Sequence, residues 1–122
     1  AALSAPVQLR TRVEQWLTGA LGGSVPGRAQ AARQFGLGER AFARRLQDED
    51  VRYADLVDGV RHALACQAVA GGAEPFVRIA RRLGFSEASA FNRAFRRWTG
   101  CAPGDWQQRG AAAPQTVPPD GR

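Results

Sequence analysis

Apolar residues recur three or four positions apart along most of this chain, which is the spacing of one face of an α-helix. We predict a first helix over residues 7–21, whose inward positions are Leu9, Val13, Trp16, Leu17 and Ala20. The glycine pair within residues 22–24 ends this helix. A short second helix is predicted over residues 28–35, with an inner face made of Ala29, Ala32 and Phe35.

A tight turn at Gly36-Leu37-Gly38 leads into a third helix over residues 39–46, where Glu39 in the first turn suits the positive end of the helix dipole. The longest periodic stretch follows over residues 53–69. Its apolar stripe consists of Leu56, Val57, Val60, Ala63, Leu64 and Ala68. The polar side of the same stretch carries Asp55, Asp58 and Arg61. We therefore predict a long amphipathic helix at the centre of the chain.

The last third of the chain returns to short helices. One is predicted over residues 75–83, with an inner face made of Phe76, Ile79, Ala80 and Leu83. After a turn at Gly84-Phe85-Ser86, Ser86 is a natural N-cap for a helix that runs to Trp98. Gly100 ends that helix, and Pro103 begins a final turn that reaches Trp106.

No segment shows the pattern of a β-strand, so the predicted fold is all-α with about seven helices. The expected organisation is an ordered module at 1–109, made of a first helical unit at about 8–52, a linker helix at about 53–70 and a second unit at about 74–109. Residues 110–122 have no periodicity and are predicted to form a disordered tail. Because the sequence begins with Ala1 rather than Met, we expect it to be a piece of a longer protein.

The charge is distributed unevenly along the chain. There are 17 basic side chains, all of them Arg, against 11 acidic ones, which gives a formal net charge of +6. Residues 76–109 hold seven Arg and two acidic residues, a net charge of +5, so nearly all of the excess lies there. A localised basic excess suits a polyanion such as nucleic acid. A solvated Arg-rich surface would have the same composition, and charge alone does not separate the two.

The sequence offers few groups for metal or covalent chemistry. Cys66 and Cys101 are far apart and His62 is the one histidine, so a zinc site would lack ligands, and we expect free thiols, no metal and no cofactor. No nucleophile–base pair or phosphate loop has a useful spacing, so no enzymatic activity is predicted. His62 is interpreted as a solvated or packing residue rather than a base, and the three Trp residues are assigned to packing. No apolar run reaches the roughly 18 residues of a membrane span, and no export signal opens the chain.

An internal repeat relates the two sets of short helices. At an offset of 48 positions, residues 31–37 align with residues 79–85, and the identical pairs are Ala32/Ala80, Arg33/Arg81 and Gly36/Gly84. After the turn the offset becomes 49, and the aligned pairs are then Phe42/Phe91, Arg44/Arg93 and Leu46/Phe95. One residue has been added to the second turn. Each copy therefore has the plan of a helix-turn-helix, in which Gly permits the turn and a small Ala lets the helices approach.

The second helix of each copy has an outward face of polar and small residues. In the first copy these are Arg40, Ala43, Arg44 and Gln47, and in the second they are Ala88, Ser89, Asn92, Arg93, Arg96 and Arg97. Arg and Asn are the residue types that read guanine and adenine edges in the major groove of DNA. Ser89 suits a base or a phosphate, whereas Arg96 and Arg97 suit phosphates. In a single copy this face would equally fit ordinary solvated positions, but two matched copies favour DNA binding.

A specific motif spans the second copy. It reads IARRLGFS at 79–86 and AFNRAFRRWTG at 90–100, followed by Ala102-Pro103. This motif resembles that of the AraC/XylS transcription regulators, and the likeness extends over about residues 8–109. The resemblance implies seven helices, with a long central helix joining two helix-turn-helix units. It places groove-facing residues at Arg40, Ala43, Arg44, Ala88, Ser89, Asn92 and Arg93. It also implies a separate effector-binding or dimerisation domain in the full-length protein, outside this chain.

The sequence departs from the family pattern at several positions. Ala43 and Ala88 stand where larger polar side chains are common, so readout there would be weak or limited to thymine methyl groups. Gly38 replaces the usual Ser or Thr cap, which should loosen the start of the helix by a few tenths of a kcal/mol, roughly. The acidic residues 48–50 also offset the Arg side chains of the first copy. We therefore expect the second copy to supply more of the affinity for DNA.

The predicted function is sequence-specific binding of double-stranded promoter DNA, which regulates transcription in the bacterial cytoplasm, at the nucleoid. A central helix of about 17 residues would span about 25 Å, which suits recognition helices in successive major-groove segments about 34 Å apart. RNA polymerase is a further candidate partner, as expected of an activator, and a membrane is not. The alternative is a helical protein-interaction module whose Arg-rich face meets an acidic partner.

Overall fold

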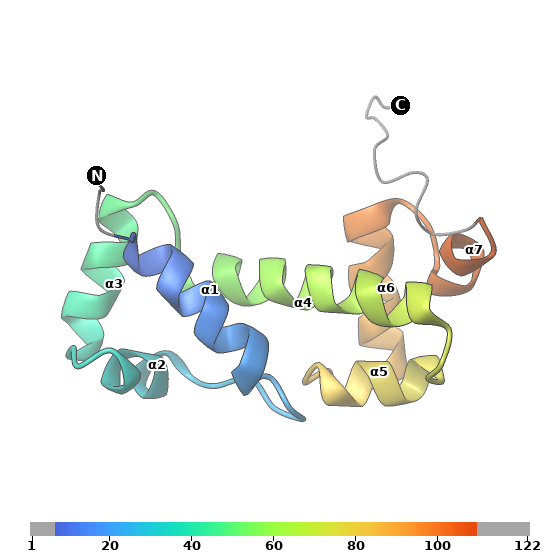
Figure 1. The fold of residues 1–122 in the computed structure, drawn as a ribbon, viewed down its shortest axis with the longest axis horizontal. Coiled ribbons are helices and arrows are strands. Elements are labelled where there is room, and N and C mark those ends of the chain that lie inside the picture. The colour runs from blue at the N-terminus through green and yellow to red at the C-terminus, as the bar shows by residue number, and fades with distance from the viewer. Residues whose placement is uncertain (1–6, 110–122) are drawn as a thin grey trace. The chain divides into compact units, whose positions relative to one another are not determined.

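The computed structural model describes residues 7–109, which form seven α-helices and no strand (Figure 1). In chain order these are α1 (Leu9–Ala20), α2 (Arg28–Gln34), α3 (Glu39–Asp48), α4 (Tyr53–Gly71), α5 (Phe76–Arg82), α6 (Ala88–Thr99) and α7 (Pro103–Gln108). The all-α prediction is confirmed, and each predicted helix end lies within two residues of the observed one. The tail predicted at 110–122 lies outside the described residues.

The described residues divide into two compact units. Unit 1 comprises residues 7–21 and 25–60, and unit 2 comprises residues 22–24 and 61–109. The division falls within α4, between Val60 and Arg61, so the two halves of this helix contribute to different cores.

Unit 1 has a core in which aromatic rings link its short helices. Its fully or nearly buried residues are Leu9, Val13, Leu17, Leu21, Ala31, Ala32, Phe42, Leu46, Leu56, Val57 and Val60. The rings of Phe35 and Phe42 stack with their centroids 6.4 Å apart, and Trp16 meets Phe35 edge-on at 6.0 Å. The expectation that Ala29 faces inward is wrong, because Ala31 is buried and Ala29 is exposed. In a helix this rich in Ala, spacing alone did not show which residues pack.

Unit 2 has a core richer in aromatic residues. Its buried residues are Ala65, Val69, Ile79, Ala80, Leu83, Phe91, Phe95, Cys101 and Trp106. The ring of Trp106 meets Phe95 edge-on at 5.4 Å, and His62 stacks on Trp98 at 5.2 Å, as expected for packing residues. The single stripe predicted for α4 is wrong in this half, because Ala63 is exposed while Ala65 and Val69 are buried. A helix that serves two cores need not keep one continuous apolar stripe.

The N-terminus of α1 is held by a residue that is distant in the sequence. The carboxylate of Glu49 accepts hydrogen bonds from the backbone N–H groups of Leu9 and Arg10, at 3.0 and 2.8 Å. The Arg10 guanidinium donates in turn to the backbone carbonyl of Glu49 at 3.2 Å. A carboxylate at this end satisfies free N–H groups and suits the helix dipole. Glu49 therefore stabilises α1, and it does more than offset the charge of neighbouring Arg side chains.

Both cysteines are free thiols, Cys101 buried and Cys66 half-buried, where burial raises the pKa of the Cys66 thiol. Across residues 7–109, no helix is long and apolar enough to cross a membrane. The same residues contain no group of three or more His, Cys, Asp or Glu side chains placed to hold a metal ion.

Candidate nucleic-acid interface

The turn between α2 and α3 is built around a glycine in the left-handed region. Gly36 has a φ of 71° and donates its N–H to the carbonyl of Arg33 at 3.1 Å. The N–H of Leu37 donates to the carbonyl of Ala32 at 2.9 Å. These two bonds form a Schellman motif, which ends a helix by satisfying its last carbonyl groups. Glycine takes this conformation without the steric cost of a Cβ atom.

The turn between α5 and α6 repeats these bonds 48 positions later. Gly84 has a φ of 87° and its N–H donates to the carbonyl of Arg81 at 3.0 Å. The N–H of Phe85 donates to the carbonyl of Ala80 at 3.0 Å. The preceding helices also match, because α2 and α5 have seven residues each and begin 48 positions apart. The repeat predicted from the sequence is therefore confirmed in the backbone.

After the turns the repeat continues with an offset of 49. The N-cap residues are Gly38 for α3 and Glu87 for α6, and neither makes a side-chain capping bond. Ser86 was predicted to cap α6, and this is wrong because the added residue moves the cap to Glu87, whose carbonyl accepts the N–H of Phe91 at 3.4 Å. Glu87 has the extended backbone that N-caps require, with a φ of −157° and a ψ of 160°.

An arginine of α4 holds the turn of unit 2. The Nε and Nη2 atoms of Arg61 donate to the carbonyl oxygens of Leu83 and Gly84, at 2.9 and 3.0 Å. Its guanidinium carbon lies 4.1 Å from the ring centroid of Phe85, which is cation–π geometry. Arg61 was predicted on the polar side of the helix, and its role as a half-buried support for this turn was not predicted. At the repeat offset of 48, unit 1 has the buried Val13, whose side chain has no donor.

The predicted outward residues are accessible in both units. Exposed side chains are those of Arg40, Arg44, Ser89, Asn92, Arg93, Arg96 and Arg97, while Ala43 and Ala88 are half-buried. Within residues 7–109, the guanidinium groups of Arg44 and Arg93 have no acidic partner. The Arg97 guanidinium lies 5.7 Å from the ring centroid of Trp98. Through Arg44 in α3 and Arg93 in α6, the second helix of each copy thus presents a cationic side chain to an anionic ligand.

The two faces differ in charge. Helix α3 carries three Arg together with Glu39 and Asp48, a net charge of +1, whereas α6 carries three Arg and no acidic residue, a net charge of +3. Outside α6, Glu87 is the N-cap residue that precedes the helix, and Glu74 pairs with Arg82 at 2.7 Å. The hydrogen bond from Arg82 is the main cause that lowers the pKa of Glu74. This pair lies outside α6 and leaves the helix uniformly basic.

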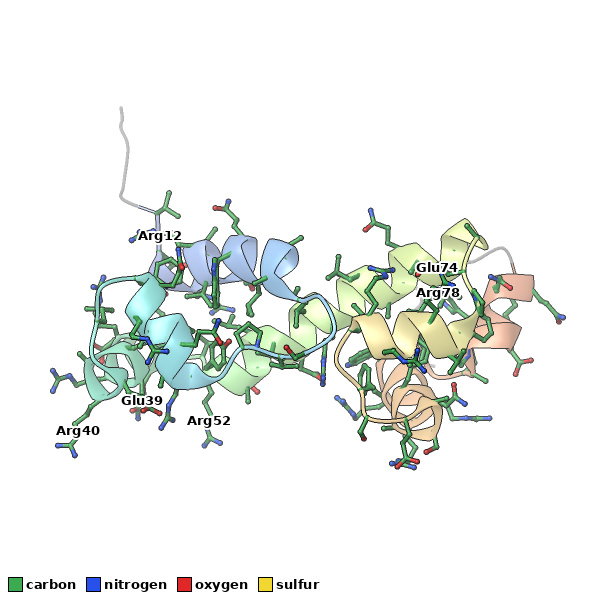
Figure 2. All side chains as sticks on the ribbon, turned by 90° about the horizontal axis from the view of Figure 1, so that it is seen from below. Arg12, Glu39, Arg40, Arg52, Glu74 and Arg78 are labelled. Carbon is green, nitrogen blue, oxygen red and sulfur yellow. The ribbon has the colours of Figure 1, made fainter. Side chains whose placement is uncertain are left out.

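Unit 1 has a groove beside α3 that the sequence did not reveal. It has a volume of about 640 Å³ and is lined by Arg28, Glu39, Ala43, Gln47, Val51, Arg52, Tyr53 and Ala54. The hydroxyl of Tyr53 donates to the carbonyl of Pro26 at 2.8 Å, which links the start of α4 to the segment before α2. Figure 2 shows Glu39, Arg40 and Arg52 projecting from the same edge of this unit.

The comparison with known families agrees with this geometry. A family model described as a helix-turn-helix domain matches residues 31–109, which include both repeated turns and the whole motif of the second copy. The chain belongs to the AraC-type helix-turn-helix family. The resemblance to AraC/XylS regulators seen in the sequence is therefore confirmed, and the family is not one of enzymes.

Relatives of this AraC-type chain include the ornithine utilization regulator of Pseudomonas aeruginosa, which is 39% identical over 100 residues. The match covers 82% of this chain and 29% of that protein, so the chain spans less than a third of its relative.

Two solved structures have the same fold. One is an AraC-type transcriptional regulator of Chromobacterium violaceum, with a TM-score of 0.73, 19% identity, and coverage of 87% of this chain and 96% of that chain. The other is the DNA-binding domain of AdpA in complex with a target DNA, with a TM-score of 0.73, 19% identity, and coverage of 91% and 100%. At this level of identity the likeness shows the seven-helix fold.

Proposed function

We propose that this chain binds double-stranded promoter DNA sequence-specifically and thereby regulates transcription. The observation that carries the proposal is the duplicated turn, followed in each unit by a helix with exposed, unpaired Arg44 or Arg93. In a helix-turn-helix this second helix is the recognition helix, and it lies in the major groove. We take α3 and α6 as the recognition helices and place them in successive major-groove segments.

The exposed residues of the recognition helices divide into two proposed roles. The base-facing positions are Arg40, Ala43, Arg44, Ala88, Ser89, Asn92 and Arg93. Among them, Arg93 suits guanine and Asn92 suits adenine, each through a pair of hydrogen bonds. Arg96 and Arg97 lie in the last turn of α6 and suit phosphate contacts. Because α6 has a net charge of +3, we propose that unit 2 supplies more of the affinity than unit 1.

Two relatives support a DNA partner: AdpA has a DNA-binding domain of this fold with target DNA bound, and the Pseudomonas protein is a regulator by name. That regulator is much longer than the matched region, so we propose that the full-length protein carries a separate effector-binding or dimerisation domain. RNA polymerase is the second proposed partner, and the cytoplasm is the proposed compartment.

The proposal is tested by fluorescence anisotropy with a duplex that the wild-type chain selects from a random library. We expect binding to weaken steeply with salt, because each neutralised phosphate adds about 0.9 to the slope of log K against log[salt]. Arg93→Ala should weaken binding about 5-fold to 100-fold, the value of one bidentate base contact. The matched control is Arg45→Ala, an exposed arginine on another side of α3. Binding that is indifferent to salt, or unchanged by Arg93→Ala, would contradict the proposal.

The placement in successive groove segments has its own test. Inserting five base pairs between the halves of the selected site turns them to opposite faces of the helix, since a turn of B-DNA is about 10–10.5 base pairs. We expect this insertion to reduce the affinity to that of a single half-site. Equal affinity for the original and the lengthened duplex would rule out simultaneous binding by both units.

A further inference from the structure

A carboxylate lies on the proposed DNA-facing edge of unit 1. Glu39 opens the first turn of α3, and its Oε2 atom accepts a hydrogen bond from Nε of Arg28 at 3.0 Å. Both side chains are about half exposed, 52% for Arg28 and 47% for Glu39. Figure 2 shows Glu39 on one edge with Arg40 and Arg52. In unit 2 the acidic residue at this end is Glu87, which is the N-cap of α6, and the first turn of the helix itself has no acidic residue.

The groove of unit 1 gives this carboxylate room for a ligand. Glu39, Ala43 and Gln47 follow each other at intervals of four, so they share one flank of α3, and all three line the groove. The side chain of Ala43 is short, which leaves open space between Glu39 and Gln47. A base edge that approaches α3 could therefore come close to the Glu39 carboxylate.

A carboxylate at this place would act on DNA in two opposite ways. It repels the phosphate backbone of every sequence, which weakens binding in general. It also accepts a hydrogen bond from an exocyclic amino group, as acidic side chains do from N4 of cytosine. The repulsion of the phosphates is offset only where a base offers an amino group to the carboxylate. A repulsive group of this kind therefore favours one sequence over others. Arg28 occupies Oε2, so Oε1 is the oxygen left for a base.

We propose that Glu39 is a selectivity residue of unit 1, which accepts a hydrogen bond from the amino group of a cytosine or adenine, and that Arg28 is the positioning residue that orients it. The proposal rests on the proposed DNA-binding function and deepens it by naming a base-reading residue outside the family motif. If Glu39 has this role, it lowers the affinity for DNA of random sequence and raises the discrimination between the selected sequence and other sequences.

The test compares Glu39→Gln with Asp48→Asn, which removes one negative charge from the opposite flank and far end of the same helix. The probes are the duplex selected by the wild-type chain and a random-sequence duplex of equal length. Glu39→Gln should bind the random duplex about threefold to tenfold more tightly, because one exposed like-charge repulsion is removed. Arg28 is then released toward a phosphate, so the salt slope should steepen by about 0.9. Asp48→Asn should leave the ratio of the two affinities unchanged.

A second measurement determines the base preference at the position that Glu39 contacts. Library selection with Glu39→Ala, which removes the acceptor oxygen altogether, should lose the preference for cytosine or adenine at one base pair in the unit 1 half-site. Arg28→Ala should weaken the same preference, and Arg28→Lys should restore part of it, which a merely structural role would not predict. If Glu39→Gln matches Asp48→Asn in the ratio of the two affinities, or if Glu39→Ala keeps the base preference of the wild-type chain, the proposal is overturned. If the wild-type chain binds no duplex, or Arg93→Ala has no effect, the DNA-binding function itself fails.

Discussion

Units 1 and 2 share a backbone plan and differ in the side chains that hold it. The turn at Gly36 is repeated at Gly84 with the same two hydrogen bonds. Arg61 holds the second turn through two carbonyl groups, whereas the residue 48 positions earlier in unit 1 is the buried, apolar Val13, which has no donor. The same backbone turn is thus formed with a half-buried arginine brace in unit 2 and without an equivalent arginine in unit 1. The two copies share the turn glycine and the Schellman hydrogen bonds. They do not share a side chain that holds the turn.

Helices α3 and α6, which we propose as the recognition helices, differ in a way that suits different roles. The charged side chains of helix α6 are all basic, and the helix buries Phe91 and Phe95. Helix α3 begins with Glu39, and three of its residues line the groove. A basic helix adds affinity for any phosphate backbone, and a carboxylate subtracts affinity unless a base compensates. We infer that unit 2 contributes mainly affinity and unit 1 mainly discrimination.

The largest expected effect concerns the aromatic core of unit 2. Phe95 is fully buried and meets Phe91, Trp98 and Trp106 at centroid distances of 5.4–6.5 Å. Phe95→Ala should lower the free energy of unfolding by about 3–5 kcal/mol, the usual cost of a large cavity. Urea unfolding in a Trp16→Phe background measures it, because the remaining Trp fluorescence then comes from unit 2. A loss below about 1 kcal/mol would show that this core is not the main support of α6.

The next largest effect is expected for Arg61, which holds the turn of unit 2. Arg61→Ala removes two hydrogen bonds from a charged donor to half-buried carbonyl groups, so unit 2 should lose about 1.5–3 kcal/mol of stability. Arg61→Lys keeps the charge but not the two-pronged geometry, and it should recover only part of the loss. Unfolding of both variants, followed in the same fluorescence assay, gives the comparison. An Arg61→Ala variant as stable as the wild type would mean that the turn of unit 2 needs no brace.

The smallest effect concerns how the recognition helices end. Helix α6 ends at Gly100 with a φ of 89°, whereas α3 is followed by Asp50 with a φ of 62°, which is strained for a residue with a side chain. Asp50→Gly should therefore raise the free energy of unfolding by about 0.5–1 kcal/mol, and Gly100→Ala should lower it by about 1 kcal/mol. Thermal unfolding by circular dichroism detects both. Changes of the same sign in the two variants would refute the assignment of strain to Asp50.

The sequence predicted those features that depend on near neighbours. Periodicity located every helix, and the pair Gly36 and Gly84 located both turns, because a Schellman turn is decided within six consecutive residues. The outward position of Arg44 and Arg93 followed from the buried Phe42 and Phe91 two places before them, since helical spacing fixes both.

The features that escaped prediction depend on residues far apart in the sequence. Glu49 contacts Leu9 across 40 positions, and Arg61 contacts Leu83 across 22. A charged side chain is usually solvated, so no local pattern marked either one as a structural support. Ala63 was assigned to the core because a single stripe was assumed for α4, although the helix is shared by two cores.

The central claim is that each unit reads its own half of one DNA site. It is tested most directly by selecting duplexes from a random library with the wild-type chain, with Arg44→Ala and with Arg93→Ala, and comparing the base preferences position by position. We expect Arg44→Ala to relax the preference in one half of the site only and Arg93→Ala to relax it in the other half only. If both variants alter the same base pairs, or if neither alters any, the two units do not read DNA separately.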